Sequence, residues 1–154
     1  DSNGTTLVVY DNAAIQATFG SLTVNTWYFW AMKVGASGAL TAYLGTEGLG
    51  SLTKVTGTVD TGGTFDQITI AATNFASTEY LKGNMAQVRA WNDLLSDAEF
   101  YNEKISATLV KTTNVLGWWE LTSAANRLVD SYGSNTLGES GFGSFTTETG
   151  PTIG

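Results

Sequence analysis

The sequence lacks the side chains that most often carry out enzyme chemistry. It contains no His and no Cys, so it has neither the commonest general base nor a thiolate, and it lacks the commonest zinc ligands. Ser-His-Asp, Cys-His and zinc mechanisms are therefore excluded within this chain. The groups left for chemistry are 14 Asp and Glu carboxylates and an aromatic set of five Trp, six Tyr and seven Phe.

The charge balance excludes several classes of partner. The 154 residues carry a formal net charge of −7 with only seven Lys and Arg. Phosphate backbones and anionic membranes are bound by clustered Lys and Arg, so we expect no nucleic acid and no anionic membrane as partner. No apolar stretch approaches the roughly 20 residues that span a bilayer, so we expect no membrane insertion. A 14% charged content with 18 Gly is typical of turn-rich all-β proteins and fits a location outside cells or on a particle.

Short apolar runs separated by turn residues predict the elements that must position these groups. The strand at 27–34 has large apolar residues on both faces, so it is either covered on both sides or lines a groove. A second strong strand is predicted at 84–92. Ser96 and Glu99 have the spacing of a capping box, which predicts one short helix near 96–107. The other predicted strands are at 5–10, 13–19, 39–44, 52–59, 67–72, 115–121, near 136 and at 144–147.

Three segments resemble the concanavalin A-like/laminin-G-like jelly-roll family. The first is a hairpin running from Trp27-Tyr28-Phe29-Trp30-Ala31 to Leu40-Thr41-Ala42-Tyr43. The second and most specific runs from Gly83 through Val88-Arg89-Ala90-Trp91 to the Ser96–Glu99 box, similar to the family's last strand and capped helix. The third, Trp118-Trp119-Glu120-Leu121 with the Asp130–Gly133 turn, looks like the tail of a phage- and bacteria-associated branch. The motif residues that the resemblance implies are Trp27, Tyr43, Gly83, Val88, Arg89, Trp91, Ser96, Glu99 and Trp119.

The resemblance implies an all-β fold, a two-sheet antiparallel jelly-roll sandwich with one short helix near 96–107. With no repeat or linker in the sequence, we predict a single domain over 1–154. The family usually carries several strands before the first hairpin, and only about 25 residues precede it here. Strands missing from a sandwich leave open edges. We therefore expect either a further N-terminal segment or neighbouring chains, as in a homo-oligomer, to complete it.

Sugar binding is one function that the resemblance and the residues favour together. Sugar rings stack on exposed aromatic rings, and their hydroxyls pair with Asn, Asp and backbone amides. Trp27, Trp91 and Trp119 fall at packing positions of the family, and Trp118 must point away from Trp119 in a strand. We therefore predict carbohydrate contacts at Trp118, with Tyr80 and Tyr132 in loops as further candidates.

Carboxylate chemistry is the other possibility. Glycanases of this fold use two carboxylates on one strand, and no predicted strand has two acids on one face. Glu99 and Glu103 are four residues apart, but on the predicted helix. Calcium could be bound by the loop residues Asp60, Asp66 and Asp130, although turn carboxylates usually bond their own backbone. We predict no enzyme activity and no cofactor other than, at most, Ca²⁺.

The sequence thus predicts a non-catalytic binding and adhesion module, directed at glycans, on a virion or cell surface. The alternative is a structural virion protein, such as a decoration, fibre or tail component, that binds neighbouring protein subunits. A glycanase is the third possibility.

Overall fold

The computed structural model describes residues 6–11, 14–61, 83–138 and 150–151. The described residues form seven strands and one helix. They are β1 (Thr6–Asp11), β2 (Ala14–Ser21), β3 (Tyr28–Val34), β4 (Ala39–Thr46), β5 (Thr53–Thr58), β6 (Val88–Trp91), α1 (Asp97–Lys104) and β7 (Val115–Trp119). The chain divides into two compact units, one made of residues 1–63, 94–111 and 152–154, the other of 64–93 and 112–151. Asp66, Tyr80 and the strands predicted at 67–72 and 144–147 lie outside the described residues.

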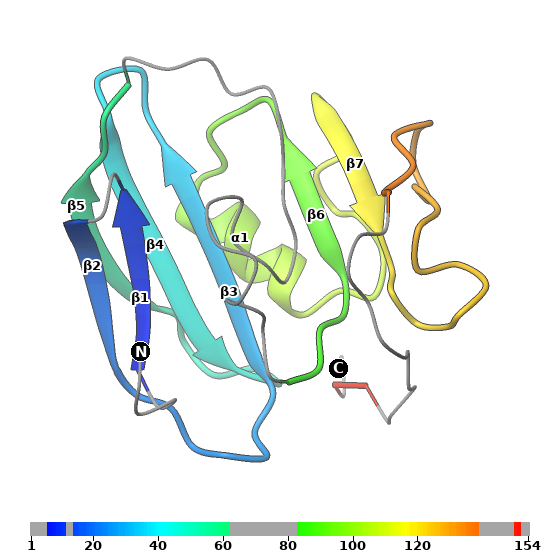
Figure 1. The fold of residues 1–154 in the computed structure, drawn as a ribbon, viewed down its shortest axis with the longest axis horizontal. Helices are drawn as coiled ribbons and strands as arrows, with labels where there is room; N and C mark the ends of the chain where they lie inside the picture. Colours follow the sequence, from blue (N-terminus) through cyan, green and yellow to red (C-terminus); the bar gives the residue numbers. More distant parts are fainter. Residues whose placement is uncertain (1–5, 12–13, 62–82, 139–149, 152–154) are drawn as a thin grey trace. The chain divides into compact units, whose positions relative to one another are not determined.

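The first unit contains an antiparallel sheet in the order β3-β4-β5 (Figure 1). The hairpin of β3 and β4 pairs Val34 with Leu40 at its tight end and Tyr28 with Thr46 at its open end. Its turn includes Gly38, whose φ of 78° is left-handed backbone that glycine adopts without steric cost. The predicted hairpin is therefore confirmed. Among the described strands, β4 is the one paired on both sides.

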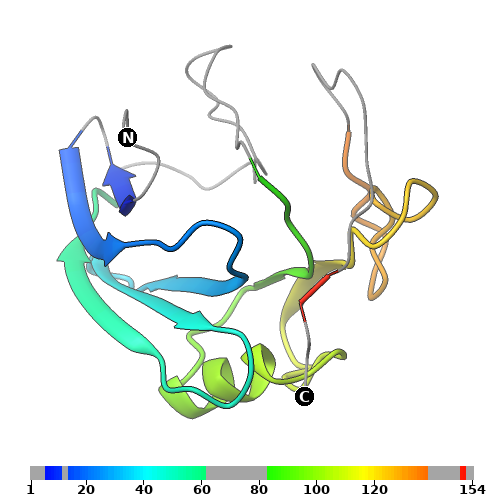
Figure 2. The same ribbon diagram turned by 90° about the horizontal axis from the view of Figure 1, so that it is seen from below.

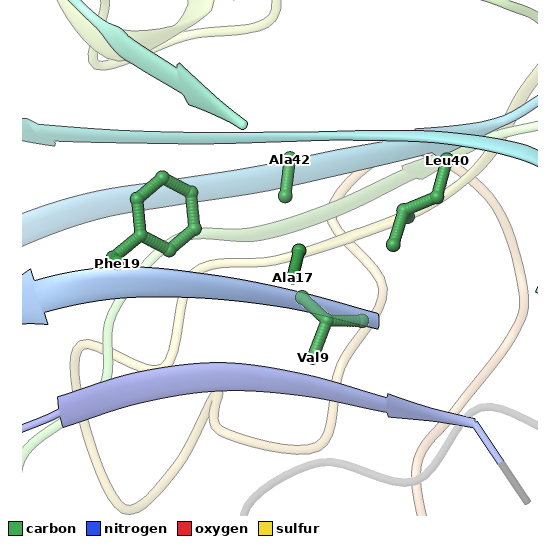
Figure 3. Close-up of a cluster of buried hydrophobic side chains, with 5 residues drawn as sticks. All are labelled: Val9, Ala17, Phe19, Leu40 and Ala42. Carbon is green, nitrogen blue, oxygen red and sulfur yellow. The ribbon is translucent and has the colours of Figure 1, made fainter. Parts of the chain in front are cut away.

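The two faces of this sheet are covered by different elements. Figure 2 shows the sheet between the β1–β2 hairpin on one side and α1 on the other. On the first side, Leu40 and Ala42 of β4 meet Val9, Ala17 and Phe19 of the hairpin, and together they form the buried core of the unit (Figure 3). Because side chains alternate along a strand, the next residues point the opposite way, toward α1.

Helix α1 packs on that second face through aromatic contact. The ring of Tyr43 in β4 is buried, and its centroid lies 4.8 Å from that of Phe100. The helix begins with the predicted capping box: the Ser96 hydroxyl accepts the Glu99 N–H, and the Glu99 carboxylate accepts the Ser96 N–H. It ends at Lys104, three residues before the predicted end at 107.

The second unit contains the antiparallel pair of β6 and β7, in which Arg89 lies opposite Trp118. The strand predicted at 84–92 is wrong in its first half, because Gln87 has a φ of 57° and pairing begins only at Val88. A φ of 57° at Leu121 likewise follows the end of β7 at Trp119. No strand forms near 136 in the described residues, where the chain instead continues the turn after Asp130.

Candidate binding surfaces

Trp118 is half-buried rather than exposed as predicted. It does point away from Trp119, which is buried. However, the Arg89 guanidinium lies 5.5 Å from the Trp118 ring centroid, and the indole Nε1–H donates to Gln87 Oε1 at 2.9 Å. The Arg89 guanidinium donates to the same oxygen at 3.2 Å. The cation covers one face of the indole and Gln87 occupies its polar edge, so less of this ring is available to a ligand than the sequence suggested.

Asp130 builds the turn that carries Tyr132. Its Oδ1 accepts the backbone N–H groups of Trp118 and Tyr132, each at 3.0 Å, and its Oδ2 accepts that of Asn135 at 3.1 Å. Burial alone would raise the pKa of Asp130, but the backbone N–H donors, Gly133 included, hold it below its ordinary value. The Tyr132 side chain is half-exposed, and its hydroxyl donates to the Thr112 carbonyl at 2.7 Å.

The remaining motif residues differ in how deeply they are buried. Tyr43 and Trp119 are buried, whereas Trp27 and Trp91 are only half-buried. Val88 and Arg89 are also half-buried within β6, and Gly83 is exposed before it.

A row of large side chains on β3, of which Trp30 and Met32 are exposed, was not among the predicted sites. Tyr28, Trp30 and Met32 lie on the same face of the sheet as Leu44 and Ala42, because Trp30 pairs with Leu44 and Met32 with Ala42. The β1–β2 hairpin buries Ala42, yet Trp30 remains 44% exposed and Met32 46% exposed. We call these three side chains the β3 row. The sequence signal for this row was the large apolar residues on both faces of the strand predicted at 27–34. The exposure of the row agrees with the second of the two interpretations given there, a strand that lines a groove.

A second surface, the α1 hollow, lies on the other face of the same sheet. It is about 290 Å³ and is lined by Tyr43, Ser51, Leu52, Lys54, Asp97 and Tyr101. One of its lining side chains is Asp97, whose carboxylate accepts hydrogen bonds from the Tyr43 hydroxyl at 2.6 Å, Lys33 Nζ at 3.3 Å and Lys54 Nζ at 2.9 Å. Hydrogen bonds from Tyr43 and Lys54 hold the pKa of Asp97 well below its ordinary value, so this carboxylate stays ionised.

Comparison with known proteins places this architecture in a family. A family model described as the concanavalin A-like lectin/glucanases superfamily matches residues 1–100 of the 154. The chain belongs to this superfamily. No curated protein and no solved structure matches the sequence. The family resemblance and the antiparallel β-sandwich class predicted from the sequence are confirmed, and membership makes the chain a relative of lectin-type binding modules and of glucanases alike.

Because the superfamily includes glucanases, the positions of the acids matter. Asp11 is the one acidic residue in the strands that the structure describes. On α1, Glu99 completes the capping box and pairs with Lys111 Nζ at 2.9 Å. Glu103 is buried and accepts the backbone N–H groups of Val110 and Lys111. Both helix carboxylates therefore hold the local backbone.

Of the loop acids proposed for Ca²⁺, Asp130 is likewise engaged by backbone, because its carboxylate accepts N–H groups of its own turn. Over the described ranges, no group of three or more acids lies close enough together to hold a metal ion. The helical part of the described chain offers no segment long and apolar enough to cross a membrane.

Proposed function

We propose that this member of the superfamily is a non-catalytic carbohydrate-binding module and that the β3 row is its main sugar-stacking surface. The observation that carries the proposal is the exposure of Trp30 on an otherwise core-facing side of the sheet. A half-exposed indole on a rigid strand gives a flat apolar surface for the C–H face of a sugar ring. Its position on β3, held by pairing with β4, orders the surface before any ligand arrives.

A role without catalysis fits the distribution of carboxylates. Hydrolysis of a glycosidic bond needs two carboxylates flanking the bond, about 5–10 Å apart. In the described residues Glu99 and Glu103 serve the backbone of α1 and its following turn. We further propose display on a virion or cell surface, in keeping with the low charge content of 14% and the tail motif similar to phage-associated relatives.

Trp118 and Tyr132 make a second proposed sugar surface, in the second unit. Tyr132 offers a half-exposed ring fixed at both ends, by its N–H on Asp130 and its hydroxyl on Thr112. Trp118 offers only the ring area that Arg89 leaves open.

A glycan array probed with the purified chain tests the proposal. We expect Trp30→Ala to weaken binding at least about tenfold, equivalent to 1.4 kcal/mol, and Trp30→Phe to retain most of it. Val129→Ala, which removes an exposed apolar side chain in the second unit, is the control and should leave binding unchanged. If Tyr132→Ala or Trp118→Ala abolishes binding while Trp30→Ala does not, the module binds sugar through its second unit instead.

Assembly with protein neighbours is the second candidate function. One edge of β3 has no strand paired to it among the described residues, and an open edge can accept a strand from another chain. A stable oligomer by native mass spectrometry, together with no binding on the array, would favour a decoration, fibre or tail protein over a lectin. Release of reducing sugar from any polysaccharide would instead establish a glycanase.

A further inference from the structure

We infer that the α1 hollow binds the carboxylate-bearing ring of an acidic sugar, a uronate. The inference rests on the proposed carbohydrate-binding function but uses different residues, on the opposite face of the β3-β4-β5 sheet from the β3 row. It gives the module a preference for acidic glycans, which the composition of a chain with net charge −7 does not suggest.

The size of the hollow is that of a small ligand site. Its volume of about 290 Å³ is close to the lower end of the roughly 300–1,000 Å³ range of small-molecule sites. Its walls come from β4, β5, α1 and the loop between the two strands. Leu52 and the ring of Tyr101 supply apolar wall, while Ser51 and Lys54 supply hydrogen-bond donors.

The loop that forms one wall is fixed by the helix. Lys104 Nζ donates to the carbonyls of Gly48 and Gly50, both at 2.6 Å, and the Tyr101 hydroxyl donates to the Leu49 carbonyl at 2.9 Å. These three bonds order the segment that carries Ser51 before a ligand arrives. A site ordered in advance loses less conformational entropy on binding.

The charges around the hollow favour an anion. Lys54 lines the hollow, and Lys33, which lies outside its lining, also pairs with Asp97, so the three side chains carry a net charge of +1. The other acids of α1 are engaged elsewhere, Glu99 by Lys111 and Glu103 by backbone N–H groups. An incoming carboxylate therefore meets the half-exposed ammonium of Lys54, beside an Asp97 carboxylate whose charge is already balanced by two lysines.

The available donors and acceptors match a uronate. Within the described residues, Lys54 uses one of its three N–H bonds on Asp97 and its side chain is 49% exposed, which leaves donors for the ligand carboxylate. Ser51 is exposed at the same wall. The Asp97 side chain is 57% exposed, so its outer lone pairs can accept a sugar hydroxyl.

Titration of the ¹⁵N-labelled chain with methyl glucuronide, methyl glucoside and sodium acetate at low salt tests the inference. We expect glucuronide to shift the amide signals of Ser51, Leu52 and Lys54, and glucoside and acetate to bind at least about tenfold more weakly. Lys54→Gln should weaken glucuronide binding at least about tenfold. Lys111→Gln makes the same change in net charge away from the hollow and should leave binding unchanged.

Three outcomes would overturn the inference: equal weakening by Lys54→Gln and Lys111→Gln, equal binding of acetate, or signal shifts that miss the hollow. Thermal unfolding of each variant confirms that it is folded. Trp30→Ala separates the two proposals, because it should weaken neutral-glycan binding at least about tenfold and leave glucuronide binding unchanged. If Trp30→Ala loses binding on the glycan array but still binds glucuronide, the inference about the α1 hollow stands independently of the β3 row.

Discussion

The hydroxyl of Tyr43 donates to Oδ1 of Asp97 at 2.6 Å, which joins the central strand of the first sheet to the first residue of α1 across 54 residues of sequence. The donor is 1% exposed, whereas the acceptor side chain is 57% exposed. The bond therefore lies at the boundary between the packed core and the α1 hollow, and it ties the start of the helix to β4.

Tyr43→Phe should raise the pKa of Asp97 and lower the stability of the fold. The substitution keeps the ring against Phe100 but removes the hydrogen bond that contributes most to the lowered pKa of Asp97. Because the pKa of Asp97 is lower in the folded state, its carboxylate stabilises the fold at pH values above the unfolded-state pKa near 3.8. This stabilisation is lost as the pH falls from there toward the folded-state pKa. The variant should therefore lose less stability on acidification than the wild type.

A ¹³C-detected titration of the Asp97 carboxyl group, with urea unfolding at several pH values, measures both effects. Tyr101→Phe is the matched control, because its hydroxyl bonds the Leu49 carbonyl and not Asp97. An Asp97 pKa that responds equally to both variants would show that the Tyr43 bond is not its cause.

These contacts show which parts of the site the sequence could reveal. The capping box of Ser96 and Glu99 was predictable because both partners lie within one helical turn, at a spacing that the geometry of the helix dictates. The partners of Asp97 come from three different strands, β3, β4 and β5, so no local pattern in the sequence marked it as part of a cluster. The α1 hollow therefore could not be predicted from the sequence.

The aromatic residues show a second limit. Alternation correctly placed Trp118 and Trp119 on opposite faces, because a strand permits nothing else. It could not show that Arg89 lies across from Trp118, nor that Trp30 lies beyond the cover of the β1–β2 hairpin, since both depend on strand register. Positive φ at Gln87 also shortened β6, and a non-glycine residue gave no warning of it.

Glu99→Gln should make the stability of the protein less dependent on pH. Lys111 first, and then the Ser96 N–H and hydroxyl, lower the pKa of Glu99 to about 2 from its ordinary 4.5. Stability from this group is present above pH 4.5 and is lost as pH falls toward 2. Chemical unfolding between pH 2 and 7 should show a flatter profile for Glu99→Gln, and Lys111→Gln should flatten it partly. A profile parallel to that of the wild type would contradict this assignment.

Gly57→Ala should destabilise the first unit where its two layers meet. A Cβ at Gly57 would lie 2.2 Å from the backbone oxygen of Gln16 in β2, so one strand must move. Overpacking of this kind costs about 1–3 kcal/mol. At Gly20, in β2, a Cβ would meet nothing within 4 Å, so Gly20→Ala should be neutral or stabilise by up to about 1 kcal/mol. Urea unfolding of both variants decides it, and equal midpoints would refute the close approach.

Asp130→Ala should destabilise the second unit, and Ca²⁺ should not raise the stability of either the wild type or the variant. The substitution removes the acceptor of the Trp118, Tyr132 and Asn135 backbone N–H groups at a position that is 7% exposed. Donors left without an acceptor cost about 1–3 kcal/mol in buried positions, so we expect a loss of about 2–3 kcal/mol, read from urea unfolding followed by Trp emission. Asp130→Asn keeps one acceptor oxygen and should lose less.

Calcium separates the two roles proposed for this carboxylate. Its oxygens already accept backbone donors, so a metal would have to displace bonds that shape the turn carrying Tyr132. We expect the melting temperature to be the same in millimolar Ca²⁺ and in EGTA. A rise with Ca²⁺ that disappears in Asp130→Asn would instead make Asp130 a ligand, because amide substitution removes the charge that a Ca²⁺ site requires.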